Sequence, residues 1–207
     1  MRKTVRKSAC NILHLEVGNA PMKVLYKLSL ICSAVLLGTL FFGNISLDAA
    51  AASSFSVSDT RFEAPKDWKK VPSASTMRRA QFAVEFKGVP EKGEVVFYYF
   101  GPGGAGGTKA NVQRWFRQFK EPETQLETRL ETIKVNNIPV TLVKATGTYM
   151  SGSPAGPKVP KPQFSLLAAI LEAPKGHIFI KFTGPRDLVD NAEKGFRSMV
   201  KSALVSE

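Results

Sequence analysis

The chain has 207 residues, and its 29 Lys and Arg outnumber its 17 Asp and Glu, which gives a formal net charge of +12. Both Cys residues, Cys10 and Cys32, lie within the first 52 residues. The remainder therefore has no thiol for a disulfide, a nucleophile or a metal. It also has a single histidine, His177, so a transition-metal site would be poorly supplied.

The first 52 residues have the order of a secretory signal peptide. Six Lys and Arg come before Leu28, an uncharged apolar run extends to Leu47, and a run of small residues follows at 49–53. A basic segment, an apolar segment and an Ala-x-Ala site in this order are typical of a signal peptide. We therefore interpret residues 1–52 as a cleaved signal peptide and residues 53–207 as a single α+β domain that is periplasmic or secreted.

Two alternatives remain open for this leader. About 20 apolar residues can span a bilayer, so an uncleaved leader would make the protein N-terminally membrane-anchored, with no other contact with the membrane. Met22 followed by Lys23 is an ordinary signal-peptide start, which makes residues 1–21 a candidate misassigned extension. Lipidation of Cys32 is disfavoured because no small residue precedes it and because it lies inside the apolar segment.

The first predicted strands follow a polar lead-in at residues 53–59. Residues 60–68 are expected to form a short extended piece that ends in a Pro turn. Apolar and polar side chains alternate in residues 80–86, which is typical of a half-buried strand. After a turn at residues 88–93, residues 94–100 are apolar on both faces, as expected for a central strand that is covered on both sides.

A helix is predicted at residues 109–120, after a glycine-rich loop at 101–107. Thr108 is in position to cap it. Four apolar residues recur at the spacing of one helical face, which predicts an amphipathic helix packed on a core. These residues are Val112, Trp115, Phe116 and Phe119.

Two predicted hairpins complete the strands. Residues 128–135 and 140–149 are joined by Asn136 and Asn137, and asparagine tolerates the left-handed conformation that tight hairpin turns need. Residues 151–162 contain four prolines and are expected to be a flexible loop without strand pairing. The second hairpin pairs residues 164–171 with residues 177–183.

A final helix is predicted from Asp187 and Asp190 to about residue 204. The two carboxylates are expected to cap free N–H groups and to favour the helix dipole. Strand hairpins with two inserted helices predict an antiparallel β-sheet packed by two amphipathic helices, one on each face. The expected fold class is therefore α+β, arranged as an α/β/α sandwich.

The glycine-rich loop matches the dinucleotide pattern G-x-G-x-x-G at Gly101, Gly103 and Gly106, between a strand and a helix. The segments after the helix are predicted to form a hairpin, whereas a dinucleotide fold needs the next parallel strand. No Gly-Lys-Ser/Thr ending of a phosphate loop occurs either. We expect no nucleotide cofactor. Binding of an anion at the helix N-terminus and a plain connector both remain open.

The remaining candidate site residues are few. Tyr98 and Tyr99 are predicted to line a shallow site, and together with Thr108 they are the only ligand-site candidates, all of them weak. No G-x-S-x-G nucleophile elbow occurs. We expect no catalytic residue, no metal and no cofactor, and we predict that the protein is not an enzyme.

Glu127 and Glu131 share one face of a predicted strand. Paired carboxylates can act as acid and base in glycoside hydrolysis. Because Arg129 lies between them, a solvent-facing charged surface is the simpler interpretation, and we expect this surface rather than a catalytic pair.

The order of segments resembles the PsbP/Mog-like fold family, beginning with Phe-Glu-Ala-Pro-Lys-Asp-Trp at residues 62–68. The resemblance implies an antiparallel sheet between helices and a non-catalytic interaction protein. Cytoplasmic relatives bind small GTPases, a partner that the leader makes implausible here. Four short strings are also similar to uncharacterised exported bacterial proteins. These strings are Met77–Phe82, Asn111–Trp115, Gly147–Tyr149 and Lys181–Pro185.

The expected export, the positive charge and the lack of a catalytic or metal-binding motif predict a non-catalytic envelope protein. Such a protein would bind another protein or an anionic polymer. Positive charge attracts such partners over long distances. Nucleic acid is not expected as a partner outside the cytoplasm. The alternative is a small-ligand or lipid-binding module in which residues 151–162 act as a lid.

Overall fold

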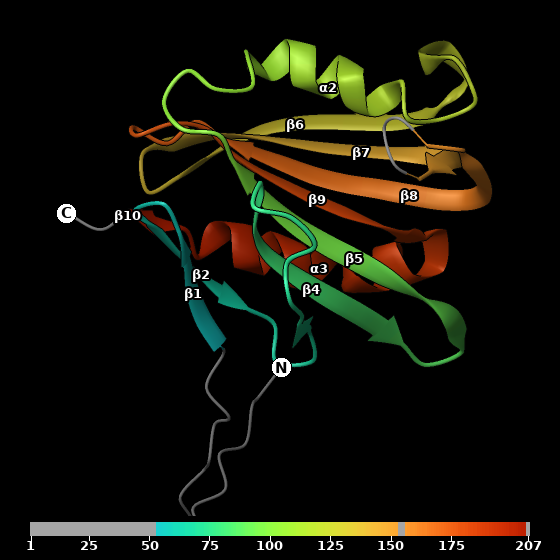
Figure 1. Cartoon of the computed structure of the whole chain (residues 1–207), viewed down its shortest axis with the longest axis horizontal. Coiled ribbons are helices and arrows are strands. Elements are labelled where there is room, and N and C mark those ends of the chain that lie inside the picture. Colours follow the sequence, from blue (N-terminus) through green and yellow to red (C-terminus); the bar gives the residue numbers. More distant parts are fainter. Residues whose placement is uncertain (1–52, 153–155, 206–207) are drawn as a thin grey trace, which may run out of the picture. The chain divides into compact units, whose positions relative to one another are not determined.

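Residues 53–152 and 156–205 are described by a computed structural model, and the predicted signal peptide lies outside them. Seven strands form one antiparallel sheet in the order β3-β4-β5-β9-β8-β7-β6, and a second sheet has the order β1-β2-β10 (Figure 1). The strands are β1 (Ser53–Val57), β2 (Thr60–Ala64), β3 (Lys69–Lys70), β4 (Arg78–Phe86), β5 (Val89–Tyr99), β6 (Glu127–Val135), β7 (Ile138–Ser151), β8 (Val159–Leu171), β9 (Ile178–Pro185) and β10 (Leu204–Val205).

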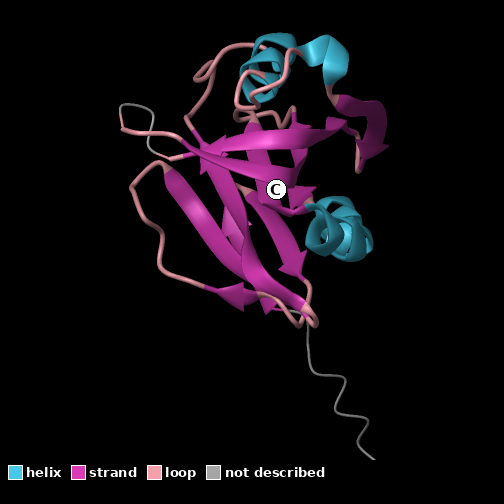
Figure 2. Ribbon diagram, turned by 90° about the vertical axis from the view of Figure 1, so that its right-hand side faces the viewer, coloured by secondary structure: helices cyan, strands magenta, loops and turns pink. Residues whose placement is uncertain are grey.

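The two α-helices lie on opposite faces of the seven-stranded sheet (Figure 2). They are α2 (Thr108–Phe116) and α3 (Arg186–Lys201), and a short 3-10 turn, η1 (Glu123–Gln125), precedes β6. This arrangement confirms the predicted α+β class, with an antiparallel sheet packed by two amphipathic helices. No helix in residues 53–152 and 156–205 is long and apolar enough to cross a membrane.

Strand alternation divides the core into two parts. On β9, Ile180 and Phe182 point to the α3 side, whereas Phe179 points to the α2 side. The α3 side also receives the small sheet and has the larger core, which includes fully buried Phe62, Phe82 and the helix residue Phe196. The α2 side is smaller. Its core residues are Val112, Trp115, Phe116, Phe119, Leu126, Val143, Ala145, Leu166, Ala168, Ile170 and Phe179.

The predicted polar lead-in at residues 53–59 is wrong. Residues 53–57 form β1, in which Phe55 and Val57 point into the α3-side core while the serines face outward. Three of these five residues are serines, so the apolar and polar alternation that is typical of a strand was not recognised. The predicted turn at residues 88–93 is also wrong, because β5 already begins at Val89.

Gly93 lies inside β5 because helix α3 approaches the sheet closely there. A Cβ atom at Gly93 would lie 2.7 Å from the Leu188 Cδ2 atom and 2.7 Å from the Phe182 ring. The glycine therefore serves packing rather than a turn.

The predicted loop at residues 151–162 is shorter than expected, because residue 151 and residues 159–162 belong to strands. β7 continues to Ser151, which pairs with Val159, and Pro160 pairs with Met150. β9 begins to pair with β8 only at Phe164. Pro160 and Pro162 therefore lie where β8 has a neighbour strand on one side alone, a position at which a strand tolerates proline.

The hairpin turn between β6 and β7 is confirmed, with positive φ angles of 44° at Asn136 and 66° at Asn137. The predicted capping role of Asp187 and Asp190 is wrong. Pro185 occupies the N-cap position of α3 without a side-chain cap, and the Asp190 carboxylate binds Lys144 and Arg186 instead. The helix also ends at Lys201, so that residue 204 belongs to β10.

Candidate functional site

Helix α2 covers only part of its face of the sheet. Its apolar stripe packs on β7, β8 and the start of β9. Beside it, β4, β5 and β9 present polar and aromatic side chains on the same face, and the strand registers place Arg78 opposite Tyr98, and Lys181 opposite Val96. We call this group the Lys181 cluster. It consists of Arg78, Gln81, Glu94, Tyr98, Gln118, Tyr149 and Lys181.

Lys181 is the centre of this cluster. Its ammonium group donates a hydrogen bond of 2.7 Å to the Gln118 Oε1 atom and lies 5.9 Å from the centre of the Tyr149 ring. Burial disfavours the charged amine and lowers the pKa of Lys181 to about 8. This lysine therefore still carries most of its positive charge near neutral pH, but in poorly hydrated surroundings.

Gln118 lies just after α2 and ties the helix end to the sheet. Its Oε1 atom also accepts a hydrogen bond of 3.0 Å from the Tyr149 hydroxyl, and its backbone carbonyl accepts one of 2.8 Å from the Met150 N–H. Burial, followed by the neighbouring Tyr98, raises the pKa of Tyr149 to about 12. The Tyr149 hydroxyl is therefore a donor at all physiological pH values.

Arg78, Gln81 and Glu94 form the other half of the cluster. The Glu94 carboxylate accepts hydrogen bonds from Arg78 (2.9 Å) and from the Gln81 amide (2.6 Å). The Gln81 oxygen in turn accepts one from Arg78 at 3.1 Å. The guanidinium thus stands in a fixed position, and part of it still faces solvent, since the Arg78 side chain is 26% exposed.

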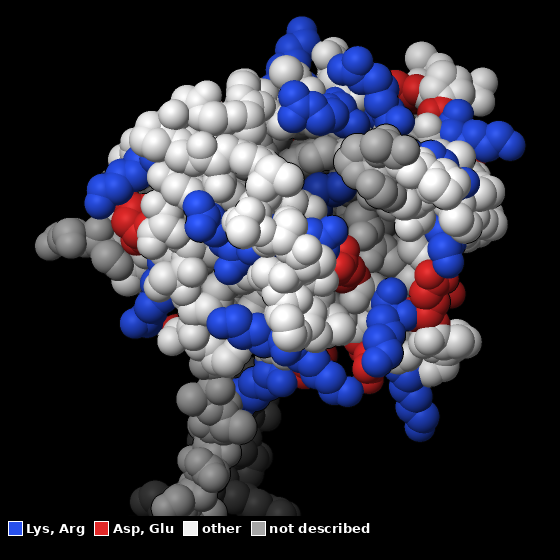
Figure 3. All heavy atoms as spheres, in the orientation of Figure 1, with Lys and Arg blue, Asp and Glu red and all other residues white. Residues whose placement is uncertain are grey.

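Tyr98 has a hydroxyl without a hydrogen bond to any residue of the described ranges. Its ring is stacked on Phe100, with 6.2 Å between the ring centres. Burial raises the pKa of Tyr98, so its hydroxyl stays protonated. The cluster contains two cations, Arg78 and Lys181, but only one carboxylate, that of Glu94. Together with the spare Tyr98 hydroxyl, the two cations are suited to bind an anionic oxygen. Figure 3 shows this side of the molecule hollowed, with Lys and Arg atoms inside the hollow.

The structure does not bring the three ligand-site candidates from the sequence together. Only Tyr98 belongs to the cluster. Tyr99 packs on the opposite, α3 side of the sheet, where its hydroxyl donates to the Lys175 carbonyl at 2.7 Å. Thr108 donates to the Glu172 carboxylate at 2.6 Å, and Gly107 occupies the N-cap position of α2. The predicted capping role of Thr108 is therefore wrong.

Lys181, Gln118 and Arg78 were not among the sequence candidates. The pattern did contain one usable signal, because Lys181 is the only charged residue in the apolar run from Ile178 to Phe182. A lysine within a central strand is seldom found without a partner. Arg78 and Gln118 carried no comparable signal, because each lies in an ordinary polar stretch.

The glycine-rich loop before α2 is held by Asn111, a buried residue of that helix. The Asn111 amide nitrogen approaches three loop carbonyls, those of Ala105 (2.9 Å), Gly106 (3.3 Å) and Gly107 (3.0 Å). The N-terminal turn of α2 is thereby tied to its own loop. His177 borders the same loop and packs against Phe179.

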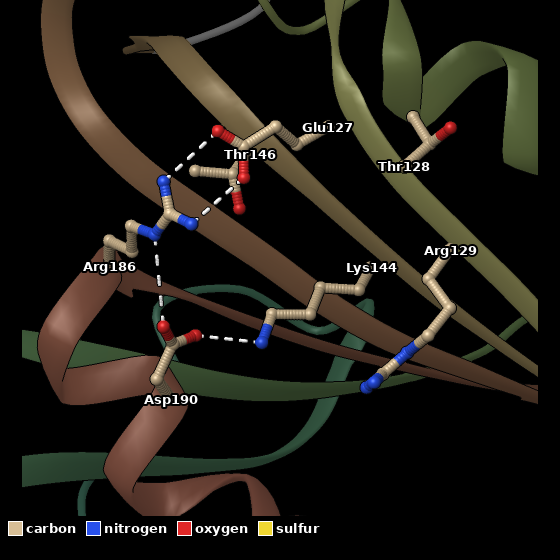
Figure 4. A pocket seen from close by; sticks show the side chains of 7 residues that line it. All are labelled: Glu127, Thr128, Arg129, Lys144, Thr146, Arg186 and Asp190. Atoms are coloured by element: carbon tan, nitrogen blue, oxygen red, sulfur yellow. Dashed lines mark hydrogen bonds and ion pairs between the residues drawn. The ribbon is translucent and has the colours of Figure 1, made fainter.

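A second hollow lies between β6, β7 and the first turns of α3 (Figure 4). Arg186 binds the Glu127 carboxylate through two nitrogens, at 3.1 and 2.8 Å. Asp190 lies between two cations, 2.7 Å from Lys144 and 3.8 Å from Arg186. The expected solvent-facing acid Glu127 is therefore paired with the helix.

The pairing continues along α3. Glu193 accepts hydrogen bonds of 2.8 Å from both Lys144 and Arg197, and it also binds Arg129. Arg197 binds Glu131 at 2.8 Å. We call this set the α3 ion-pair network. It consists of Glu127, Arg129, Glu131, Lys144, Arg186, Asp190, Glu193 and Arg197, four acids and four bases, so it has no net charge to attract a ligand.

Desolvation of Glu193 is outweighed by the hydrogen bonds from Lys144 and Arg197, which lower its pKa to about 2. This is the behaviour of a carboxylate that holds a helix on a sheet. Among the residues that the structure describes, no group of three or more His, Cys, Asp and Glu side chains is placed to hold a metal ion.

No protein-family model and no curated protein sequence matches this chain. Among solved structures, it is similar to cyanobacterial PsbP (CyanoP) from Synechocystis sp. PCC 6803, with a TM-score of 0.49 and 14% identity over 78% of this chain and 96% of that chain. A Pseudomonas aeruginosa protein of unknown function has a TM-score of 0.42 and 14% identity, covering 76% of this chain and 98% of that one.

A Bacteroides thetaiotaomicron structure has a TM-score of 0.43 and 9% identity, over 76% of this chain and 49% of that chain. The expected similarity to PsbP and to uncharacterised bacterial proteins is thus confirmed at the level of the fold. At such low identities the likeness assigns no site residue, ligand or partner to this chain.

Proposed function

We propose that this protein is an exported, non-catalytic binding module that holds an acidic group of a macromolecular envelope partner in the Lys181 cluster. The observation that carries the proposal is the combination of a desolvated lysine and a spare tyrosine hydroxyl on one open face. The Lys181 ammonium makes one hydrogen bond, to Gln118, although an ammonium can make three. A ligand carboxylate or phosphate would supply the missing acceptors.

Charge and position support this role. The residues after the leader retain all but six of the 29 basic side chains and all but two of the 17 acidic ones. A positive net charge steers acidic partners toward the molecule. The ring of Phe100, 44% exposed, adjoins Tyr98 and gives the same face an apolar contact for a partner.

The export part of the proposal is tested by mass spectrometry of the N-terminus of protein purified from cells. A first residue near Ser53 and recovery from the envelope or the medium are expected. An intact leader in the membrane fraction would replace the secreted form with the anchored alternative. Recovery of the intact chain from the cytoplasm would contradict export.

Binding is tested by placing a photo-crosslinking amino acid at Phe100 in cells. Reproducible adducts with one envelope component are expected, and Lys181→Met should remove them because it deletes the cation. The matched control places the crosslinker at Lys194, an exposed residue of α3, where no such adduct should form. Adducts of equal yield from both positions, or adducts that persist in Lys181→Met, would contradict the proposal.

The second candidate function, a small-ligand or lipid-binding module, uses the same hollow. It predicts no macromolecular adduct but a raised melting temperature with acidic metabolites or with vesicles of anionic lipid. Lys181→Met should abolish that shift as well. The presence or absence of a macromolecular adduct therefore distinguishes the two functions.

A further inference from the structure

Strand β6 forms one edge of the seven-stranded sheet, and no other strand of the described residues pairs with its outer side. It is the last strand in the order, and the six residues from Glu127 to Thr132 are all exposed. The opposite edge, β3, has only two residues. Backbone N–H and C=O groups along an edge strand lack partners on their outer side and can pair with another strand.

Two features that commonly block such an edge, proline and a β-bulge, are absent from β6. The strand contains no proline, and its pairing with β7 runs without a bulge from Glu127 opposite Thr146 to Val135 opposite Ile138. Charged side chains can also block an edge. Here Glu127, Arg129 and Glu131 are held by α3 through the ion-pair network.

The side chains of β6 are complementary to those of a second β6 in antiparallel orientation. We propose that two copies of this protein pair through β6, about a two-fold axis at Leu130. Leu130 would then lie opposite the partner's Leu130. On the same face Thr128 would lie opposite the partner's Thr132, and on the other face Arg129 would lie opposite the partner's Glu131. Apolar and threonine pairs are favourable across antiparallel strands, and the Arg129–Glu131 positions bring no like charges together.

The competing registers are worse. Opposed residues must point to the same face of a continuous sheet, so the axis has to coincide with a residue. An axis at Arg129 would place two arginines opposite each other, and an axis at Glu131 would place two glutamates opposite each other, and both contacts are repulsive. An axis at Thr132 would bring Leu130 opposite a lysine, Lys134. An axis at Thr128 would pair only the first three residues of β6, because the strand begins at Glu127. Leu130, 55% exposed in the single chain, would gain an exposed apolar partner within β6 only in the proposed register.

Cysteine cross-linking tests the register directly. In the full chain carrying Cys10→Ser and Cys32→Ser, Leu130→Cys should form a disulfide-linked dimer on mild oxidation. Thr132→Cys alone should not, because the two Thr132 positions would be about 13 Å apart along the strands. Thr128→Cys co-expressed with Thr132→Cys should cross-link again. Equal cross-linking by Thr132→Cys alone would overturn the proposed register.

Sedimentation of the otherwise unmodified chain tests the pairing itself. A concentration-dependent dimer is expected, and Leu130→Lys should raise its dissociation constant at least about tenfold by placing two ammonium groups at the axis. The melting temperature of the single chain should not fall, because Leu130 is exposed. A monomer at every concentration, or a dimer insensitive to Leu130→Lys, would overturn the proposal. If β6 instead binds a strand of another protein, the same variant will lose that protein without having formed a dimer.

Discussion

Lys181 is the single residue in which burial and charge conflict most strongly. Its pKa is about 8 in the folded protein, below the ordinary lysine value of 10.5. The unfolded chain therefore binds more protons than the folded chain between these pH values. Folding stability should accordingly rise as the pH increases from about 8 to 10.5.

The measurement is a pH titration of the lysine Nζ signals by heteronuclear NMR, with urea unfolding at several pH values. One lysine should titrate near pH 8 and disappear in Lys181→Met, and that variant should lose the rise in stability. Lys144 is the internal control, since the hydrogen bonds that it donates to Asp190 and Glu193 outweigh burial and raise its pKa. A Lys181 signal that titrates at 10.5 would contradict the proposed desolvated site.

At this scale the sequence predicted backbone geometry better than contacts. Asn136 and Asn137 were predicted correctly because the left-handed turn depends on the two residues themselves. Thr108 was predicted to cap its own helix, but a carboxylate 64 residues away in the sequence, that of Glu172, binds its hydroxyl. A hydrogen-bond partner this distant in the sequence can be identified only when the strands are placed in register.

At the scale of elements, helix α3 is attached to the sheet by an apolar stripe and by the α3 ion-pair network. Glu193 binds three cations of that network, and its side chain is only 17% exposed. We expect Glu193→Gln to lower the free energy of unfolding by about 2 kcal/mol at pH 7, because the partly buried cations Lys144 and Arg197, and the exposed Arg129, lose their common anion.

The pKa of Glu193, about 2 against an ordinary 4.5, sets the pH window. Its stabilisation is complete above pH 4.5 and is lost as the pH falls toward 2. Urea unfolding between pH 7 and pH 2 should therefore show a steeper acid loss in the native chain than in Glu193→Gln. Glu63→Gln, which breaks an exposed pair of 3.6 Å with Arg61, is the control and should have little effect. A native chain as acid-resistant as the variant would contradict this role.

The elements with a clear period were predicted correctly, and those with mixed signals were not. The apolar stripe of α2 and the alternation in β4 each identified a buried face without further information. β1 and the start of β8 were missed because serine and proline dominate their local pattern. Their strand conformation depends on pairing with β2 and β7, which a local window cannot contain.

At the scale of the whole molecule, the second and the last strands of the described domain are neighbours. Val205 of β10 pairs with Thr60 of β2, and Leu204 pairs with Arg61. The preceding carbonyl, that of Ala203, accepts a hydrogen bond of 2.9 Å from the Asn136 amide. The segment-by-segment prediction gave the layers of sheet and helices correctly. It contained no information on the pairing of β10 with β2, which we call the closure of the small sheet, because β10 is only two residues long.

Ending the chain after Ala203 should lower the free energy of unfolding by about 1–2 kcal/mol, because β2 loses its backbone partners on one side. Hydrogen exchange of the β2 amides should become faster, while exchange in β8 and β9 should stay unchanged below the global unfolding limit. Leu204→Ser, which keeps the backbone and changes a half-exposed side chain, is the matched control. Equal protection of β2 in the truncated and the full chain would contradict the role of β10.

The closure between β2 and β10 also governs when the domain can fold during its synthesis. Strand β2 leaves the ribosome long before its neighbour β10, and α3, which fills the larger core, comes directly before β10. Contacts so far apart in sequence form slowly and cannot form on a partial chain. The nascent polypeptide should therefore not complete this fold before α3 and β10 have left the ribosome, and until then chaperones can bind it as an unfolded chain.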